Sequence, residues 1–303
     1  MNKEQKKQLF EMFESRVSFD SSMARRTTFK TGGKADAFLE VLEEEELCNL
    51  LPWLRKEGLP CTVIGWGSNL IVKDHRLKGM VVRLGGKLSE LRLDDSREPR
   101  IFAGAGLSIK DFLRWCRVQG LSGMEFLAGI PGTLGGAVFM NAGAFGKEIC
   151  EHVLKVHMVT PLGLKKDFTR AELEFSYRKL EMERGNLITH ICFGVEKGTE
   201  EKVSQRMTGF LKKRREAQPL ELPSAGSVFK NPPGDFAGRL IEKAGLKGAR
   251  MGGAMISEKH ANFIVNTGNA SSEDILALID LAKKKVKKDF GVRLELEIQV
   301  IGE

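Results

Sequence analysis

The sequence predicts an α+β protein of two or three domains. Its 303 residues are more than a single hydrophobic core usually serves. Segments with the alternating pattern of strands and segments with the helical spacing of apolar residues follow one another along the whole chain. The glycine-rich turn at residues 65–69 leads into a strand-like Leu-Ile-Val and not into a helix. This order argues against a doubly wound dinucleotide fold of the GxGxxG type.

The composition is that of a globular protein and narrows the class of partner. Hydrophobic residues make up 42% of the chain, and no apolar run approaches the ~20 residues of a membrane helix. The charged N-terminus lacks the apolar core of a signal peptide, so we expect a cytoplasmic protein. The net charge is +8, but most basic residues alternate with acidic ones and aromatic stacking residues are few, which disfavours nucleic acid. A basic cleft for nucleotides or other phosphate-bearing small molecules accounts for the charge as well.

The cysteines predict neither a disulfide framework nor a metal site. There are five of them, an odd number, and they are scattered along the chain. The sequence contains no CxxC pair and no cluster of cysteine with histidine. We therefore expect free thiols and no bound metal.

The first part of the chain is expected to mix helices with short strands. The charged N-terminus has helical character. Residues 43–57 form an amphipathic helical stretch, and Pro52 inside it should kink the helix or begin a second one, because proline lacks the N–H that the helix requires. Strands are expected at residues 37–42, 61–65 and 79–84.

The middle of the chain is expected to contain strands, a hairpin and two helices. Ser108 has the side chain of a helix N-cap, and Gly120 should end the helix that follows. One face of that helix carries Ile109, Phe112, Leu113 and Cys116. The other expected elements are strands at 101–106 and 187–195, a hairpin of 155–160 with 164–169 around Pro161-Leu162-Gly163, and a basic helix at 200–216.

The last part of the chain should contain two helices and two strands. A helix is expected within residues 237–248 and a strand at 261–266. Ser271 or Ser272 should cap a second helix, whose apolar residues recur at helical spacing. Residues 292–300 alternate strictly, with Val292, Leu294, Leu296, Ile298 and Val300 on one side and Arg293, Glu295, Glu297 and Gln299 on the other. This pattern predicts a final strand with one buried face.

Two glycine-rich stretches have the composition of ligand-binding backbone. Residues 65–69 can turn their N–H groups toward an anion, although a tight turn between strands has the same composition. Residues 129–146 combine many small residues with large apolar ones such as Ile130 and Met140. A flat phosphate-bearing cofactor fits such a surface, and a glycine-rich structural loop is the alternative.

Four polar residues are candidates for chemistry, and each has an ordinary structural alternative. Arg178 is a fixed cation suited to a carboxylate or enolate, but a surface arginine has the same sequence pattern. Ser227 has no nearby histidine and no GxSxG turn, which argues against a nucleophile and leaves a proton donor or a turn serine. Lys230 can hold a phosphate. Glu297 and Glu295 share the polar face of the last segment, and the alternation does not separate them.

Taken together, these stretches closely resemble the UDP-N-acetylenolpyruvoylglucosamine reductase family (UDP-N-acetylmuramate dehydrogenases). They follow the family order from about Thr27 to Gly302. The interval between Arg178 and Ser227 is short and the single tyrosine is Tyr177, so the chain resembles the subtype without an inserted substrate-clamping tyrosine. The matching stretches are TTFKTGGKADAFLEV, VIGWGSNLIV, AGAGLSI, GMEFLAGIPGTLGGAVFMNAGAFG, FSYR, QPLELPSAGSVFKNP, LIEKAGLKG, GGAMISEKHANFIVN and LELEIQVIG.

The resemblance implies a particular α+β architecture. It is the FAD-binding fold of the vanillyl-alcohol-oxidase / p-cresol-methylhydroxylase type, made of two subdomains and followed by a C-terminal α+β substrate-binding domain. Such a fold binds a dinucleotide without GxGxxG. The implied limits are residues 1–86 and 87–205 for the FAD-binding subdomains and 206–303 for the substrate-binding domain, whose last strand can return to the FAD-binding part.

The resemblance also implies which residues form the site. Arg178, Ser227 and Glu297 match the family's catalytic residues. Tyr177, Lys230 and Asn231 match positions near the substrate. The residues expected to contact FAD are Gly65, Gly67, Ser68, Asn69, Ile130, Pro131, Gly132, Thr133, Gly135, Gly136, Ala137, Asn141 and Gly143.

The activity implied is the NADPH-dependent, FAD-mediated reduction of UDP-N-acetylglucosamine enolpyruvate to UDP-N-acetylmuramate in peptidoglycan precursor synthesis. Hydride passes from NADPH to FAD and from flavin N5 to C3 of the enolpyruvyl group. In the family mechanism Arg178 supports the resulting aci-carboxylate, Glu297 assists it, and Ser227 protonates C2.

The chain departs from the family pattern at two positions, and two other functions stay open. Trp66 stands where the family usually has glycine, and Leu180 stands where it often has serine. One alternative is a flavin- or nucleotide-binding relative without the reaction, against which the retained Arg178, Ser227 and Glu297 argue. The other is a related FAD oxidase of a small alcohol, against which the segments SAGSVFKNP and SEKHANFIVN argue.

Overall fold

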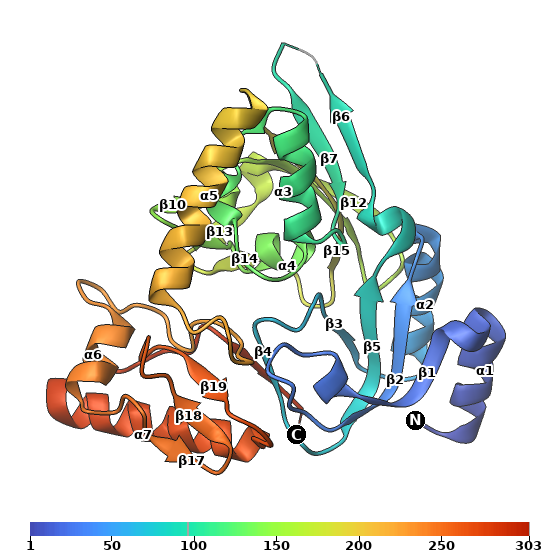
Figure 1. Cartoon of the computed structure of the whole chain (residues 1–303). Coiled ribbons are helices and arrows are strands. Elements are labelled where there is room, and N and C mark those ends of the chain that lie inside the picture. The colour runs from blue at the N-terminus through green and yellow to red at the C-terminus, as the bar shows by residue number, and fades with distance from the viewer. Residues whose placement is uncertain (96, 303) are drawn as a thin grey trace. The chain divides into compact units, whose positions relative to one another are not determined.

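The computed structural model describes residues 1–95 and 97–302, which divide into two compact units (Figure 1). The larger unit comprises Met1–Phe19, Ala37–Gly65 and Gly79–Lys212. The smaller unit comprises Asp20–Asp36, Trp66–Lys78 and Lys213–Glu303. Each unit has its own buried hydrophobic core. The finer division into three domains stays a prediction.

A four-stranded sheet and two helices form the N-terminal part of the fold. The strand order is β1-β2-β5-β3, and β3 runs parallel to β5. Nearly every side chain of β2 and β5 is buried, which is the pattern of strands covered on both faces. Three of the limits between the two units fall within β1, β2 and β5. The elements are α1 (Lys3–Phe13), β1 (Val17–Ser22), β2 (Lys34–Val41), α2 (Glu44–Lys56), β3 (Cys61–Val63) and β5 (Leu77–Leu84).

Helix α2 continues past Pro52 as one helix, so of the two alternatives, a kink or a second helix, the second helix is wrong. Proline leaves the carbonyl of Cys48, four residues earlier, without its helical donor. Gly163 lies so close to this carbonyl that a Cβ at Gly163 would be 2.2 Å from the oxygen. The face that anchors the helix in the core carries Leu47, Leu50, Leu51 and Leu54. Burial of these four leucines outweighs one missing hydrogen bond.

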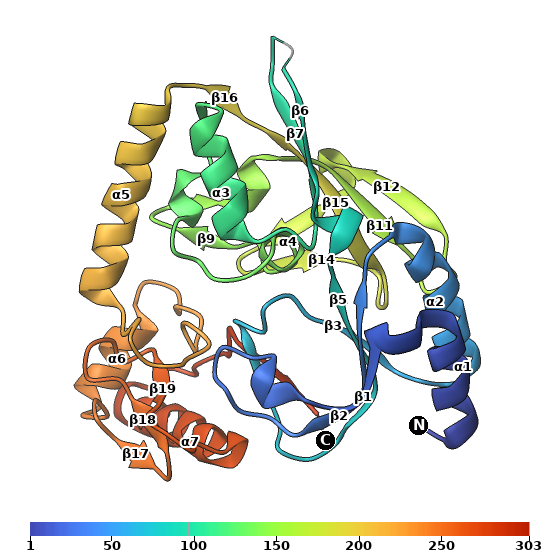
Figure 2. The same ribbon diagram turned by 45° about the vertical axis from the view of Figure 1, so that its right-hand side comes forward.

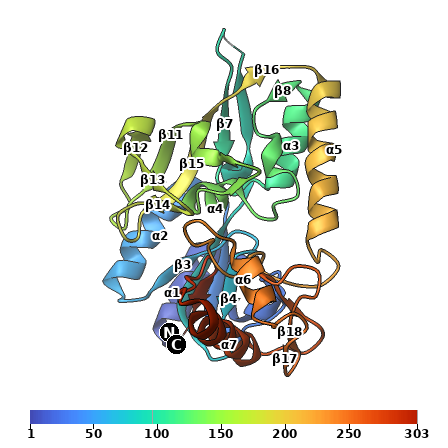
Figure 3. The same cartoon turned by 90° about the vertical axis from the view of Figure 1, so that its left-hand side faces the viewer.

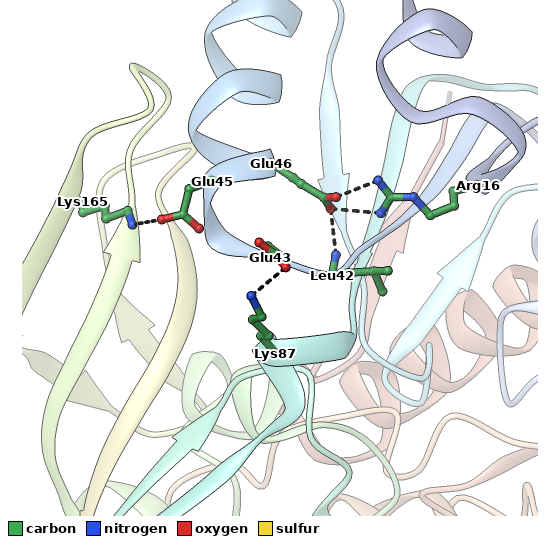
Figure 4. Close-up of polar contacts among 7 residues, drawn as sticks. All are labelled: Arg16, Leu42, Glu43, Glu45, Glu46, Lys87 and Lys165. Atoms are coloured by element: carbon green, nitrogen blue, oxygen red, sulfur yellow. Dashed lines mark hydrogen bonds and ion pairs between the residues drawn. The ribbon is translucent and has the colours of Figure 1, made fainter.

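Charged side chains hold the first turn of α2 (Figure 4). The carboxylate of Glu46 accepts hydrogen bonds from Arg16 Nη2 at 2.6 Å and from the backbone N–H of Leu42 at 2.8 Å. Acidic side chains are favourable at a helix N-terminus because they complement the helix dipole. Two further ion pairs shown there are Glu43–Lys87 at 2.8 Å and Glu45–Lys165 at 2.7 Å.

The middle of the chain forms a five-stranded antiparallel sheet of order β12-β11-β15-β7-β6 (Figure 2). The predicted hairpin is confirmed, since Val156 of β11 lies opposite Phe168 of β12. The central strand β15 buries most of its side chains in the core of the larger unit. The strands are β6 (Leu91–Asp94), β7 (Arg100–Gly104), β11 (Val153–Val159), β12 (Lys165–Thr169) and β15 (Leu187–Gly194).

Helices and short strands surround this sheet. The predicted helix cap is confirmed, because Ser108 Oγ accepts a hydrogen bond from the N–H of Asp111 at 3.0 Å. Gly120 follows the helix end with φ of +64°, a left-handed conformation that glycine adopts readily. Helix α4, which packs on β15, was not predicted. The elements are α3 (Ile109–Val118), β8 (Leu121–Ser122), α4 (Leu134–Phe139), β9 (Gly143–Ala144), β10 (Lys147–Glu148), β13 (Glu174–Ser176), β14 (Lys179–Glu181), β16 (Glu196–Lys197) and α5 (Glu200–Ala217).

The C-terminal segment of the smaller unit is a small three-stranded sheet with two helices (Figure 3). Helix α7 packs against β17, β18 and α6. Ser271 is its N-cap, and the hydroxyl of Ser272 donates instead to Asp74 Oδ2 at 2.9 Å. The elements are α6 (Ala237–Lys243), β17 (Arg250–Met251), β18 (Ala254–Ile256), β19 (Ile264–Asn266) and α7 (Ser272–Phe290).

The predicted strand at residues 292–300 is only partly confirmed. Its end forms β20 (Gln299–Ile301), which runs parallel to β4 (Leu70–Val72) in the same unit. Before it, the chain joins the segment around Ser227 through one isolated bridge and separate hydrogen bonds, and not through a continuous ladder. The predicted burial still holds at Leu294 and Ile298, which lie in the core of the smaller unit.

Candidate active site

Small residues bring the turn at Gly65 and helix α4 together in the larger unit. A Cβ at Gly65 would lie 2.5 Å from Thr133 Oγ1, and a Cβ at Gly135 would lie 2.8 Å from the Cβ of Ala105. The Thr133 hydroxyl also accepts a hydrogen bond from the N–H of Gly136 at 3.4 Å, which caps α4. Glycine is therefore required at positions 65 and 135 for the backbone to pack this closely.

In the turn after Gly65, two backbone carbonyls accept hydrogen bonds from other residues of the smaller unit. The carbonyl of Gly67 accepts from the N–H of Thr28 at 3.3 Å, and that of Asn69 accepts from Gln299 at 2.9 Å. A Cβ at Gly67 would lie 2.4 Å from the carbonyl oxygen of Arg26. Because a trans peptide points its N–H away from its C=O, the N–H of Ser68 is directed away from Thr28. Among the described residues, the N–H groups of Gly67 and Asn69 donate no hydrogen bond.

Each of these stretches has, within its own unit, a backbone suited to a ligand. Consecutive N–H groups around a residue with positive φ, here Gly67 at +63°, make a concave anion site. Backbone that packs without side chains lets a flat ligand approach closely. Which of these residues contact FAD stays a prediction.

Arg178 lies at the tip of the β13–β14 hairpin with a strained backbone. Ser176 pairs with Lys179, so Tyr177 and Arg178 form a two-residue turn. Arg178 has φ of +60°, in the left-handed region that costs a non-glycine residue about 1 kcal/mol. Leu180, at the position where the family often has serine, is buried in the core and anchors the hairpin. Strain of this kind persists only where the surrounding structure holds it.

The guanidinium of Arg178 is held from several sides. Its Nη2 donates to the carbonyl of Gly143 at 3.0 Å, and its Nη1 lies 3.8 Å from Glu148 Oε1. The guanidinium carbon also lies 4.8 Å from the centre of the Tyr177 ring, a cation–π distance. The side chain is 17% exposed, so a charge that it faces would be poorly screened by water.

Asn141 is completely buried, and its side chain is fully used by the protein. Its Nδ2 donates to Glu148 Oε2 at 2.8 Å and to the carbonyl of Ser176 at 3.0 Å. Its Oδ1 accepts from the N–H of Cys150 at 3.3 Å. Both amide hydrogens therefore have acceptors, and the backbone N–H donates to the carbonyl of Val138 at 3.0 Å, so Asn141 could only accept from a cofactor.

Ser227 and Glu297 are joined through one residue of the smaller unit. The carbonyl of Val228 accepts from the N–H of Glu297 at 2.9 Å, and the N–H of Val228 donates to the carbonyl of Asn262 at 2.8 Å. Glu297 is half-buried, whereas Glu295 is exposed. The structure therefore separates two glutamates that the sequence alternation left equivalent.

The residues expected near the substrate belong to both units. In the smaller unit, the backbone N–H of Lys230 donates to the carbonyl of Glu295 at 2.9 Å, which fixes where its side chain begins. Asn231 Oδ1 accepts from the N–H of Ala237 at 3.1 Å and so holds the first turn of α6. In the larger unit, Tyr177 is an exposed side chain beside Arg178.

Asn262 supports the Ser227 segment and was not singled out from the sequence. It is almost fully buried, and its side chain makes two hydrogen bonds with the backbone of Phe229, at 2.9 Å to the N–H and 2.8 Å to the carbonyl. Its own N–H donates to His260 Nδ1 at 3.2 Å. An asparagine in a strand-like stretch is a weak sequence signal for such a role. Only the fold shows that its side chain bonds the backbone of Phe229 as a neighbouring strand would.

The described residues contain neither a cluster of metal ligands nor a helix that could span a membrane. Within residues 1–95 and 97–302, no group of three or more His, Cys, Asp or Glu side chains could hold a metal ion. In the same ranges no helix has both the length and the apolar character needed to cross a membrane.

Comparison with known proteins gives consistent matches. Residues 35–167 match the FAD binding domain family, and residues 218–301 match the family of the C-terminal domain of UDP-N-acetylenolpyruvoylglucosamine reductase. A reductase of that name from Caldanaerobacter subterraneus subsp. tengcongensis is 43% identical over 96% of this chain and 95% of its own. Another from Bacillus pumilus is 39% identical over 98% of both chains. The crystal structure of the enzyme from Thermus caldophilus is similar with a TM-score of 0.81 and 36% identity, over 94% of this chain and 98% of that one.

Proposed function

Because the chain belongs to the UDP-N-acetylenolpyruvoylglucosamine reductase family, we propose that Arg178, Ser227 and Glu297 carry out its reaction. The family makes it an FAD-dependent oxidoreductase of peptidoglycan synthesis, with NADPH as the co-substrate. The proposed reaction converts UDP-N-acetylglucosamine enolpyruvate to UDP-N-acetylmuramate.

The protein's task is to stabilise a charge and to deliver a proton. Bound FAD, reduced by NADPH, supplies the hydride that adds to C3 of the enolpyruvyl group. The substrate then carries an aci-carboxylate with two negative charges, and the Arg178 guanidinium stabilises it through charge-assisted hydrogen bonds. Ser227 donates its hydroxyl proton to C2. The hydride and the proton together saturate the double bond, and Ser227 regains its proton from solvent.

Glu297 has a supporting role in this step. Its half-buried position beside the Ser227 segment lets it meet the same charge as a neutral acid or as a hydrogen-bonding partner. A serine needs no histidine here, because the strong base is the carbon that the hydride has just made electron-rich. This is why the residues around Ser227 include no activating histidine pattern.

The observation that carries the proposal is the hydrogen bond of Val228 with Glu297, which holds Ser227 and Glu297 in adjoining backbone segments. The residues proposed to line the FAD site are those of the glycine-rich stretches, in which Asn141 can only accept a hydrogen bond. Tyr177, Lys230 and Asn231 are proposed as substrate contacts. The cytoplasmic location stays a prediction.

An anaerobic visible spectrum tests the function directly. NADPH is added to the purified protein, followed by UDP-N-acetylglucosamine enolpyruvate. We expect the oxidised-flavin spectrum to bleach with NADPH and to return with the substrate. If the flavin spectrum bleaches with NADPH but does not return with the substrate, the substrate assignment is wrong. Protein that binds no FAD even after reconstitution would point to a binding relative without the reaction.

A further inference from the structure

We infer that Glu148 is a positioning residue for Arg178 and that Asn141 holds Glu148 in that role. The inference rests on the proposed function, since it takes Arg178 as the residue that meets the substrate charge. It adds two residues that act through Arg178. It also changes the use of Asn141, which the sequence resemblance placed among the FAD contacts.

Asn141 connects three parts of the larger unit. Its side chain bonds Glu148 at the end of β10, the carbonyl of Ser176 at the end of β13, and the N–H of Cys150. Ser176 is the residue directly before the turn that carries Arg178. The buried amide therefore sets the distance between the Arg178 hairpin and Glu148.

Glu148 completes the connection through its second oxygen. Oε2 accepts from Asn141, while Oε1 lies 3.8 Å from Arg178 Nη1. The carboxylate is also part of a capping box with Glu151, whose side chain accepts from the Glu148 N–H at 2.7 Å. Glu148 is thus fixed by its neighbours and presents one oxygen toward the guanidinium.

Gly143 leaves room for this arrangement. A Cβ at Gly143 would lie 2.9 Å from Arg178 Nη1, 2.7 Å from the carbonyl oxygen of Lys147 and 3.1 Å from Glu148 Cγ. Any larger residue would push the guanidinium or the Glu148 side chain out of place. Gly143, Glu148 and Asn141 together define the space that the Arg178 guanidinium occupies.

Two effects of Glu148 on the reaction oppose each other. Its negative charge weakens the field of Arg178 at a dianionic substrate, and its contact keeps the guanidinium in position. The Glu148 side chain is 33% exposed and its oxygen is 3.8 Å away, so solvent screens much of the charge effect. Arg178 has a strained backbone at a hairpin tip and depends on outside contacts to stay in place. The positioning of the Arg178 guanidinium by Glu148 should therefore matter more to the reaction rate than the weakening of its electrostatic field.

The test uses Glu148→Gln, which keeps the shape and an oxygen acceptor for Asn141 but removes the charge facing Arg178. With the FAD-loaded full-length protein, we expect the rate of flavin reoxidation at saturating substrate to fall about tenfold. The half-saturating substrate concentration and the rate of flavin reduction by NADPH should stay near wild type. The matched control is Glu181→Gln, which breaks the 2.6 Å ion pair with Lys179 on the same hairpin. It should leave both rates unchanged.

A double-mutant cycle separates positioning from a general loss of structure. In an Arg178→Ala background, adding Glu148→Gln should slow reoxidation no further, because Glu148 acts through Arg178. A further tenfold loss there, or a reoxidation rate of Glu148→Gln at or above wild type, overturns the inference. If wild type is itself not reoxidised by the substrate, the proposed function has failed. Wild-type reoxidation with no effect of Glu148→Gln refutes this inference alone.

Discussion

The N–H of Glu297 donates a 2.9 Å hydrogen bond to the carbonyl of Val228, the residue directly after Ser227. Ser227 and Glu297, 70 positions apart in the sequence, are thereby held in adjoining backbone segments. The carbonyl of Glu297 in turn accepts from Asn69 Nδ2 at 3.2 Å, next to the N–H groups proposed to hold the FAD diphosphate. One short stretch of the smaller unit thus links a proposed proton donor, its acidic partner and a proposed cofactor contact.

Replacing Ser227 by alanine should separate the two half-reactions. Flavin reduction by NADPH should be unchanged, because no proton from Ser227 is needed in that step. Reoxidation by substrate should slow by about 10²–10⁴-fold, the usual effect of losing a positioned proton donor. Anaerobic stopped-flow spectra of each half-reaction measure both rates. Equal damage to both would rule out a proton-donor role.

Glutamine at position 297 should harm turnover far more than glutamine at position 295. Glu297 is half-buried beside the Ser227 segment, whereas Glu295 is exposed and serves as a matched control. We expect kcat to fall about 10²-fold for Glu297→Gln and to stay near wild type for Glu295→Gln. Steady-state assays at saturating substrate provide the comparison. The reverse order would mean that the other face of this segment serves the reaction.

Lys230→Ala should mainly weaken substrate binding. The backbone of Lys230 is fixed by the carbonyl of Glu295, so only the ammonium group is lost. A charge-assisted contact with the diphosphate arm predicts a KM for the UDP substrate about tenfold higher, with kcat little changed. The KM for NADPH is measured alongside. An unchanged KM for the UDP substrate would remove Lys230 from the site.

Asn262→Ala should destabilise the smaller unit. It leaves the buried N–H and carbonyl of Phe229 without their partners, a loss of about 2–4 kcal/mol in the free energy of unfolding. Asn262→Asp keeps the acceptor but turns a carboxylate oxygen toward the carbonyl of Phe229 in a buried place, and should cost at least as much. Urea denaturation of the three proteins gives the free energies. Wild-type stability of the alanine variant would show that water replaces the side chain without cost.

Stability should fall in mild acid, partly through His260. Burial lowers the pKa of His260 below its ordinary value of 6.5, and its Nδ1 accepts a hydrogen bond that protonation would end. Because the folded pKa is depressed, the unfolded chain binds the proton first as the pH drops. The stabilisation is therefore complete above pH 6.5 and is lost as the pH falls toward the folded pKa.

Urea midpoints measured at about pH 7.5 and about pH 5.5 provide the test. His260→Gln should reduce the difference between the two midpoints, whereas His75→Gln, at an exposed position, should not. Burial lowers the pKa of His190 in the same direction, so part of the difference should remain. A wild-type-like difference in the His260 variant would assign the effect to other groups.

Local sequence signals determined much of the secondary structure. The helix that begins after Ser108 and ends before Gly120 follows from its cap, its apolar face and its terminal glycine, all of which act within a few residues. The hairpin of β11 and β12 likewise follows from alternation on both sides of Pro161-Leu162-Gly163. The motifs of the family were also sufficient to predict the FAD-binding fold and the reductase family.

Tertiary structure decided what depends on partners far away in the sequence. Helix α2 continues through Pro52 because four leucines are buried against the rest of the unit. Residues 292–298 form no continuous ladder because they make separate hydrogen bonds with distant residues, among them Val228 and Asn69. The separate positions of Glu295 and Glu297, and the use of the Asn141 amide by Glu148 and Ser176, have the same cause. Burial and hydrogen-bond partners are properties of three-dimensional contacts, and a linear pattern specifies only which residues could make them.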